Sequence, residues 1–351
     1  MEFDYLHLYV DDYQSAHHCY QHQWGFTCLN KIITDQGITG IYQQGQILLM
    51  VSAPTSESDF SRYGHYLQKH PPGIGEVAWQ IEAENWPSFS VHLEQKQIKT
   101  SPINHPLTGA EGLTFLAWGD VAHSVYPARP SLKSQKSHGS NLTTIDHVVL
   151  NIGADQFTQA SQWYQQVFDW SVQQQFTINT FHSGLYSEAL INANGKVQFN
   201  LNCPTTNTSQ IETFLANNGG AGIQHVAFAT DNIIETVGHL RAQGVEFLSV
   251  PPSYYKQQQQ CSHFHHNYLN LDWDSLERLQ ILLDDQAHTG EQLLLQIFSL
   301  PCYGDGSLFW EIIERRHRAK GFGEGNFQAL YEAVEALEQQ LEVPQWSGKI
   351  Y

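Results

Sequence analysis

Three residues of this sequence have types and positions that could bind a divalent metal ion. Glu311 lies in the apolar run Leu308–Ile313, where strand alternation places it on a face with apolar side chains. A carboxylate on such a face is costly unless a partner satisfies it. His147 and His225 open two other short apolar segments at matching positions. Taken singly, each residue is more typical of a hydrogen-bonded core side chain. Together they match the two-histidine, one-carboxylate triad of non-haem Fe(II) oxygenases.

These residues belong to a pattern that recurs four times, a short apolar strand followed by a helical stretch. The four copies run from Leu6 to Tyr20, from Glu76 to Leu93, from Asp146 to Tyr164 and from Gln224 to Leu240. His7 and His147 occupy the same place in the first and third copies. The pattern predicts a duplicated domain in which each half is a duplicated βα-type module. Most other apolar segments alternate as strands do, so we expect an α+β protein rich in antiparallel sheet.

Polar stretches divide the chain. Residues 131–141 follow Pro127 and Pro130 and predict a linker between an N-terminal domain (1–130) and a C-terminal domain (142–351). Residues 254–270, which include four consecutive glutamines, predict an irregular insertion. Apolar residues at helical spacing from residue 327 on predict a C-terminal helix. Three glycines between residues 321 and 325 would allow this helix to move as a lid.

The composition excludes several classes of partner. With 351 residues the chain has room for roughly two domains of ~150 residues. Lys and Arg number 17 against 35 Asp and Glu, and the net charge of −18 argues against nucleic acid or an anionic membrane surface as partner. No apolar run approaches the ~18 residues of a membrane span, and the acidic start does not resemble a signal peptide, so we expect a cytoplasmic protein. Five cysteines without a Cys-x-x-Cys pair disfavour a disulfide scaffold or a zinc ribbon.

The C-terminal half resembles a known enzyme family. The similarity rests on four blocks, Gly220 to His225, Leu294 to Phe298, Phe309 to Arg315 and Gly321 to Phe327. These blocks are similar to signature segments of the 4-hydroxyphenylpyruvate dioxygenases, and their sequences resemble those of a cyanobacterial member. The resemblance covers about residues 142 to 342, whereas the N-terminal half matches in module layout only. It implies the vicinal-oxygen-chelate fold, two tandem domains of paired βαβββ modules that form open, glyoxalase-like barrels.

The resemblance also implies roles for individual residues. His147, His225 and Glu311 match the ligands of one Fe(II) per chain. The polar catalytic positions of the family match Gln224, Gln296 and Asn326. Its substrate-binding positions match Ser187, Asn202, Gln210, Phe298, Phe309, Phe322 and Phe327. In a regular strand Gln224 points away from His225, so we expect it to act from behind the ligands. Asn200 stands where the family usually has proline.

The reaction that the resemblance implies converts 4-hydroxyphenylpyruvate and O2 to homogentisate and CO2. It would serve tyrosine catabolism, or the supply of tocopherol and plastoquinone precursors. One alternative is 4-hydroxymandelate synthase, which uses the same triad and substrate; Asn202 and the phenylalanines favour the dioxygenase. Others are a non-catalytic ligand-binding member, against which the complete triad argues, and an interaction protein that uses the acidic surface. We expect a homo-oligomer, either a dimer or a tetramer.

Two further histidine groups are expected to bind no metal. His263, His265 and His266 lie in the glutamine-rich insertion and are interpreted as a solvated loop. In the N-terminal half His7 repeats the position of a ligand, but Glu76 stands where His225 does. The segment from Phe115 to Trp118, taken as the closing strand of that half, has no carboxylate. We therefore expect the N-terminal half to be a scaffold.

Overall fold

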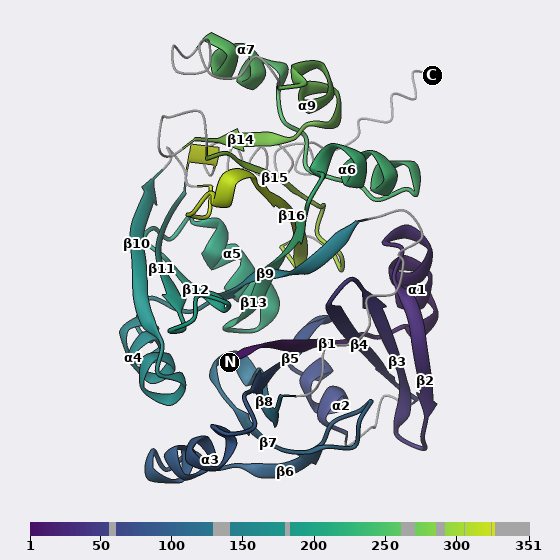
Figure 1. Cartoon of the computed structure of the whole chain (residues 1–351), viewed down its shortest axis with the longest axis vertical. Coiled ribbons are helices and arrows are strands. Elements are labelled where there is room, and N and C mark those ends of the chain that lie inside the picture. Colours follow the sequence, from purple (N-terminus) through teal and green to yellow (C-terminus); the bar gives the residue numbers. More distant parts are fainter. Residues whose placement is uncertain are drawn as a thin grey trace, which may run out of the picture.

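The computed structural model describes residues 1–55, 61–128, 141–179, 183–260, 271–285, 292–304, 306–323 and 325–326. The first half of the chain forms one eight-stranded sheet (Figure 1). Its strands are β1 (Glu2–Tyr9), β2 (Thr27–Ile33), β3 (Gly37–Gln44), β4 (Ile47–Pro54), β5 (Gly73–Ile81), β6 (Ser101–Asn104), β7 (Glu111–Leu116) and β8 (Ala122–Pro127). Its helices are α1 (Tyr13–His18), the π-helical turn η1 (Cys19–Gln23), α2 (Arg62–Leu67), α3 (Trp86–Gln95) and the 3-10 turn η2 (Trp118–Asp120).

The second half forms another eight-stranded sheet. Its strands are β9 (Leu142–Asn151), β10 (Ser171–Asn179), β11 (Gly184–Ile191), β12 (Gln198–Pro204), β13 (Gly222–Thr230), β14 (Leu282–Asp284), β15 (Leu294–Phe298) and β16 (Phe309–Arg315). Its helices are α4 (Phe157–Phe168), α5 (Gln210–Asn218), α6 (Ile233–Ala242), α7 (Pro252–Gln260), α9 (Trp273–Leu279) and the 3-10 turn η3 (Arg316–Arg318). None of the helices in the described residues is both long and apolar enough to cross a membrane.

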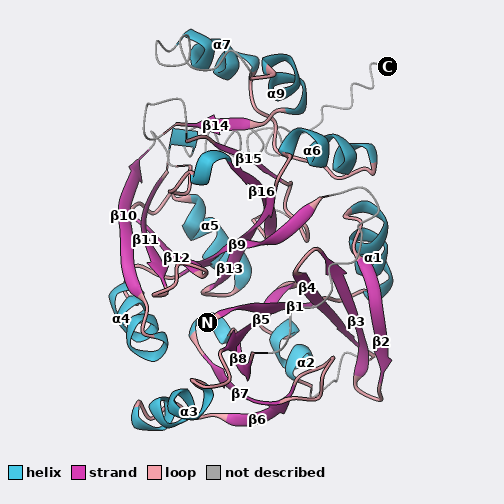
Figure 2. Ribbon diagram, in the orientation of Figure 1, coloured by secondary structure: helices cyan, strands magenta, loops and turns pink. Residues whose placement is uncertain are grey.

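The two sheets have the same strand order. The first runs β2-β3-β4-β1-β5-β8-β7-β6 and the second β10-β11-β12-β9-β13-β16-β15-β14. In each, two four-strand modules meet at a central antiparallel pair, β1 with β5 and β9 with β13. Figure 2 shows both sheets strongly curled, with most helices outside the curl. The predicted α+β class, the duplication and the four strand-helix copies are confirmed.

Local sequence explains where the helices begin and end. The apolar residues of α4 recur at helical spacing and are buried on one side, and Asp169 ends the helix in the left-handed conformation. Helix α5 begins after Ser209, whose side chain accepts a hydrogen bond from the Ile211 N–H, and it ends at Gly219 with φ +72°. These signals fix the segments that connect the strands of each module.

The two halves share one aromatic core. Trp79 on β5 and Trp310 on β16 are fully buried. The Trp310 ring meets Trp24 of the first half at a centroid distance of 6.1 Å, and the Trp79 ring meets Trp170 of the second half at 5.2 Å. Because burying one large apolar side chain contributes about 1.5–3 kcal/mol, these contacts hold the halves together strongly. The apolar cluster that contains them spans both sheets.

A buried histidine joins the halves by hydrogen bonds. Trp79 Nε1 donates to Nδ1 of His123 at 2.9 Å. His123 Nε2 must then carry the proton, which it donates to the Tyr164 hydroxyl on α4 at 3.0 Å. His123 is completely buried, and this burial lowers its pKa to about 3. The folded protein therefore keeps this imidazole neutral.

One predicted element is wrong in part. The region expected to be an irregular insertion begins with a helix, α7, which contains Tyr254 and Tyr255. Lys and Gln favour helix, Pro252 suits a first helical position, and burial of both tyrosines fixes the helix on the protein. Residues 261–270, with the three clustered histidines, lie outside the described residues.

The predicted boundaries of the two domains stay a prediction, because residues 129–140 lie outside the described part of the chain. The same holds for the C-terminal helix, since no residue after Asn326 is described.

Candidate metal centre

Three adjacent strands of the second sheet bring the predicted ligands together. His147 lies on β9, His225 on β13 and Glu311 on β16, and their ligand atoms all lie within 4.8 Å of one another. In the strand register His147 and Glu311 both pair with Ala227, so only a methyl group separates them on this face. Nε2 of His147 lies 3.3 Å from the Glu311 carboxylate oxygen Oε2, and Nε2 of His225 lies 3.8 Å from the same atom.

Burial and charge set the protonation of this cluster in the absence of metal. All three residues are at most 5% exposed. Burial lowers the pKa of His147, but the carboxylates of Glu311 and Asp146 outweigh it and raise the pKa to about 9. Burial and the charge of His147 together lower the pKa of His225 well below its usual value. Burial raises the pKa of Glu311, although His147 acts in the opposite direction. The protein thus holds the carboxyl group of Glu311 and the imidazole of His147 in buried contact.

A divalent cation fits this donor set. Glu311 Oε1 is buried and has no hydrogen-bond partner among the described residues. Both histidines direct Nε2 toward Glu311, while Nδ1 of each is turned toward another side chain. Two imidazole nitrogens and a carboxylate from three strands leave further coordination positions open, as non-haem Fe(II) sites require. A cation would also replace the proton of His147 as the positive partner of the Glu311 carboxylate.

Sequence reasoning missed two residues that support His147. Asp146 accepts a hydrogen bond from His147 Nδ1 at 2.8 Å, which fixes the ring with Nε2 free for a ligand role. Arg315 on β16 donates twice to the Asp146 carboxylate, both times at 2.7 Å. Burial raises the pKa of Asp146, but Arg315 outweighs it and keeps the carboxyl ionised. The sequence contained a signal for both supporting residues, since Asp146 directly precedes His147 and Arg315 follows Glu311 in the same strand.

Gln224 lies behind His225, although a regular strand would turn it away. Its amide oxygen lies 3.4 Å from His225 Nδ1. The reason is a register shift in β13 between Ile223 and His225, which breaks the simple alternation. Such an irregularity cannot be recognised from the apolar pattern of the segment.

Buried polar side chains lie on the same face of the second sheet as the centre, and several of their atoms have no partner among the described residues. Ser187 and Asn202 lie directly opposite each other on β11 and β12. The Ser187 hydroxyl and both amide atoms of Gln296 are buried and have no partner among the described residues. Asn200 shares the face of Asn202 and leaves its side-chain oxygen without a partner there too. Because buried polar groups normally find partners, these atoms indicate a site for a polar ligand.

The remaining polar candidates are Gln210 and Asn326. Gln210 is the first residue of α5, where its backbone N–H donates to the Ser183 hydroxyl at 3.1 Å. Asn326 is fully buried, and its side-chain oxygen accepts a hydrogen bond of 2.7 Å from Tyr254 of α7. Sequence reasoning missed Tyr254 because it assigned that region to an irregular insertion.

Three phenylalanines contact the ligands or each other. The Phe309 ring stacks on His225 at 4.8 Å, and Phe298 meets Phe309 edge-on at 6.1 Å. Phe322 lies edge-on to His147 at 5.3 Å. Arg315 donates to the Gly321 carbonyl oxygen at 2.8 Å, so the residue that supports His147 also holds the turn before Phe322. The fourth predicted wall residue, Phe327, lies outside the described residues.

The first sheet carries a different group at the equivalent place. Its closing strand is β8, so the assignment of that role to residues 115–118 was wrong; the turn η2 separates the two segments. Ser124 on β8 pairs with Ala78 as Glu311 pairs with Ala227. Glu76 accepts hydrogen bonds from Ser124, from Tyr5 at 3.1 Å and from His7 at 3.0 Å. Protein donors therefore surround this carboxylate.

Comparisons with known proteins agree with this geometry. Residues 144–264 match the family described as the Glyoxalase/Bleomycin resistance protein/Dioxygenase superfamily. The chain is 74% identical over 345 residues to an uncharacterized protein of Synechocystis sp., covering 98% of this chain and 100% of that protein. It is 33% identical over 307 residues to the 4-hydroxyphenylpyruvate dioxygenase of Legionella pneumophila, covering 86% of this chain and 84% of that enzyme. The chain belongs to the 4-hydroxyphenylpyruvate dioxygenase family.

A solved structure supports the assignment to 4-hydroxyphenylpyruvate dioxygenases and their relatives. A triple mutant of 4-hydroxymandelate synthase from Streptomyces coelicolor superposes with a TM-score of 0.81 at 25% identity, over 96% of this chain and 98% of that one. The protein is thus an enzyme, an oxidoreductase of the dioxygenase class with a tandem vicinal-oxygen-chelate fold.

Proposed function

We propose that the protein is an Fe(II)-dependent dioxygenase that converts 4-hydroxyphenylpyruvate and O2 to homogentisate and CO2. The observation that carries the proposal is the buried cluster of His147, His225 and Glu311 in a chain of this family. These three residues would hold one Fe(II) per chain. When bound, Fe(II) supplies coordination positions for the 2-oxo acid and O2 and the electrons that activate O2.

The chain's own residues would bind and orient the substrate. Gln296 and Ser187 offer buried polar atoms that lack protein partners, and a substrate oxygen would satisfy them. Gln224 and Asp146 hold the two histidine rings in their orientations. The further polar positions that we assign to catalysis or substrate binding are Asn202, Gln210 and Asn326.

The aromatic residues would position the ring of the substrate and exclude water. Phe309 and Phe298 lie on the β15–β16 side of the centre, and Phe322 covers His147. We assign Phe327 to the same wall from the sequence. An apolar enclosure strengthens the electrostatic interactions within it and protects a reactive oxidant from solvent.

4-Hydroxymandelate synthase is the second candidate, because the solved structure with a TM-score of 0.81 carries that name. The two functions differ in product, not in the ligands they need. Asn202, opposite Ser187, and the phenylalanine wall favour attack on the ring, and homogentisate is therefore the product we propose.

We also propose a location, an oligomeric state and a pathway for the enzyme. We place it in the cytoplasm as a homo-oligomer, with the first half of the chain as a scaffold without metal. Its product would enter tyrosine breakdown or the synthesis of tocopherol and plastoquinone.

An oxygen electrode and product chromatography test the function together. Protein stripped with a chelator is reloaded with Fe(II) or, as control, with Zn(II), and is given 4-hydroxyphenylpyruvate. We expect O2 uptake and formation of homogentisate with Fe(II) and neither of them with Zn(II). Formation of 4-hydroxymandelate would establish the second candidate, and substrate binding without O2 uptake would indicate a non-catalytic member of the superfamily.

A further inference from the structure

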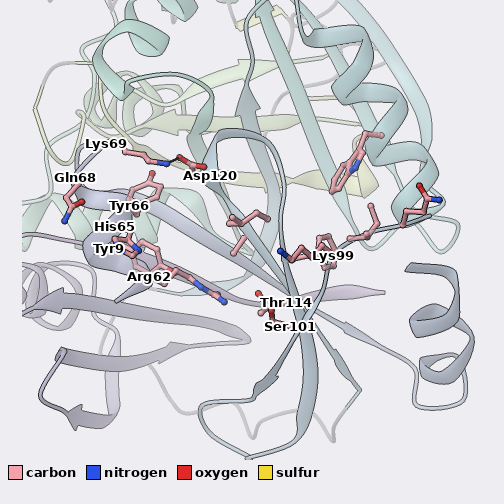
Figure 3. A pocket seen from close by; sticks show the side chains of 16 residues that line it. Tyr9, Arg62, His65, Tyr66, Gln68, Lys69, Lys99, Ser101, Thr114 and Asp120 are labelled. Carbon is pink, nitrogen blue, oxygen red and sulfur yellow. Dashed lines mark hydrogen bonds and ion pairs between the residues drawn. The ribbon is translucent and has the colours of Figure 1, made fainter. Parts of the chain in front are cut away.

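The first half of the molecule contains a cavity that the metal centre does not use. Its volume is about 690 Å³, within the range of small-molecule sites. It lies between α2, the strands β6 and β7 and the first residue of β8, with Trp163 of α4 on one side (Figure 3). No residue assigned to the metal centre or its substrate lines it.

The lining of the cavity is basic although the protein is acidic. Arg62, Lys69 and Lys99 line it, three of only 17 Lys and Arg residues in a chain of net charge −18. Lys69 is paired with Asp120 at 2.9 Å. Arg62 lies 3.5 Å from Glu76, a carboxylate that already accepts hydrogen bonds from three other side chains. Figure 3 shows Arg62 and Lys99 reaching inward from different sides toward the region of Ser101 and Thr114. This arrangement favours an anion.

Two buried hydroxyls belong to the wall of the cavity, and that of Thr114 has no partner among the described residues. Thr114 is 4% exposed, and its Oγ1 makes no hydrogen bond to any described residue. Tyr9 is 1% exposed, and its hydroxyl interacts with Arg62. Leaving the Thr114 hydroxyl unpaired costs free energy, which a hydrogen bond to a ligand oxygen would recover.

Aromatic rings make up the apolar part of the wall. Tyr66 lies edge-on to Tyr9 at 5.4 Å, and Trp163 lies 6.3 Å from Phe115. Rings at these spacings offer flat surfaces on which an aromatic ligand can pack. Because Trp163 belongs to the second half of the chain, a ligand here would contact both halves.

We propose that this cavity is a binding site for a small aromatic carboxylate. The carboxylate lies between Arg62 and Lys99 and accepts hydrogen bonds from the hydroxyls of Tyr9 and Thr114, and the ring packs against Phe115 and Trp163. The site is separate from the metal centre and does not depend on the proposed reaction.

Calorimetric titration of the full-length protein with 4-hydroxyphenylacetate tests the proposal. Because the metal centre could also bind this probe, the His225→Ala variant is titrated in parallel. We expect binding that persists in His225→Ala, weakens at least about tenfold in Arg62→Gln, and weakens in Thr114→Val, which keeps the shape and removes the hydroxyl. Lys96→Gln is the matched control: it removes an equal charge three residues before Lys99, outside the cavity. Circular dichroism confirms that each variant is folded.

Two other probes test the ligand chemistry. The neutral amide of the same acid should bind at least about tenfold more weakly, because it lacks the charge that Arg62 and Lys99 recognise. Inorganic phosphate should also bind more weakly, because it has no ring. Equal binding of the amide or of phosphate would overturn the proposal. So would binding that is lost in His225→Ala but kept in Arg62→Gln, or no binding of the acid at all up to about 10 mM.

Discussion

The guanidinium of Arg315 holds the carboxylate of Asp146 through two hydrogen bonds of 2.7 Å. This pair joins the two strands that carry His147 and Glu311, since Asp146 directly precedes His147 on β9 and Arg315 lies on β16 with Glu311. Asp146 in turn fixes the His147 ring at 2.8 Å. The orientation of His147 therefore depends on an arginine that acts through Asp146.

Replacing this arginine by lysine should weaken metal binding. Arg315→Lys keeps the charge but cannot form the paired hydrogen bonds to Asp146. We expect the affinity for Fe(II) to fall about 10- to 100-fold, the usual cost of losing support behind a metal ligand. Competition with a chromophoric chelator measures it. The matched control is Arg316→Lys, at the next residue, which pairs with Glu314 instead. Equal affinity in the two variants would show that the Asp146 pair is only structural.

Gln296 should stabilise the complex with substrate and lower the stability of the free protein. Both of its amide atoms are buried without partners among the described residues. Gln296→Leu removes these unpaired groups at similar volume, so we expect the free energy of unfolding to rise by about 1–2 kcal/mol. We expect kcat/KM to fall at least about tenfold.

Urea denaturation and steady-state kinetics on the Gln296→Leu protein measure both effects. Gln44→Leu in the first sheet is the contrast. Gln44 is buried and donates to the carbonyl oxygens of Trp24 and Gly25, so its loss should lower stability. A Gln296→Leu protein that is destabilised and fully active would contradict the role assigned to this residue.

Stability should fall in mild acid because of His123. Its pKa is lowered to about 3 by burial, whereas in the unfolded chain it is about 6.5. Below pH 6.5 the unfolded chain therefore binds a proton that the folded protein does not, and unfolding becomes easier. Between pH 7 and pH 5 this residue alone should remove about 2 kcal/mol.

The His123→Gln variant separates this effect from those of other groups, because glutamine does not titrate and can still accept from Trp79. Its loss of stability from pH 7 to pH 5, measured by urea denaturation, should be smaller than that of the wild type by about 2 kcal/mol. An equal loss of unfolding free energy from pH 7 to pH 5 in the two proteins would show that His123 is not the cause.

The sequence predicted that His147, His225 and Glu311 lie together, because this follows from strand alternation and from the repeated module, both of which can be recognised in the sequence. It predicted the four strand-helix copies for the same reason. It missed Asp146 and Arg315, whose pairing requires knowledge that β9 and β16 flank β13. The sequence placed Gln224 behind the ligands, but it did not predict its contact with His225, because the bulge in β13 leaves no mark in the apolar pattern. The closing strand of the first sheet was misplaced because β7 and β8 are both short and apolar, and only the strand order distinguishes them.

The two halves should respond differently to loss of equivalent histidines. His147→Ala should abolish Fe(II) binding, because it removes one of the three proposed ligands. His7→Ala should leave the iron content per folded chain unchanged and turnover within several-fold, since His7 contacts Glu76 and Ser52 and no metal ligand. Iron analysis and oxygen-electrode assays measure both. An inactive, iron-free His7→Ala protein that remains folded would place a metal site in the first half.

The most direct test of the proposed function is the yield of homogentisate as Fe(II) is titrated into metal-free protein, with O2 consumption followed at the same time. The proposed function predicts that turnover rises in proportion to iron and stops rising at one iron per chain, with one homogentisate formed for each O2 consumed. It predicts no iron-dependent turnover in Glu311→Gln, which keeps the shape of the side chain and removes its charge. Turnover in Glu311→Gln equal to that of the wild type, or a wild-type product other than homogentisate, would contradict it.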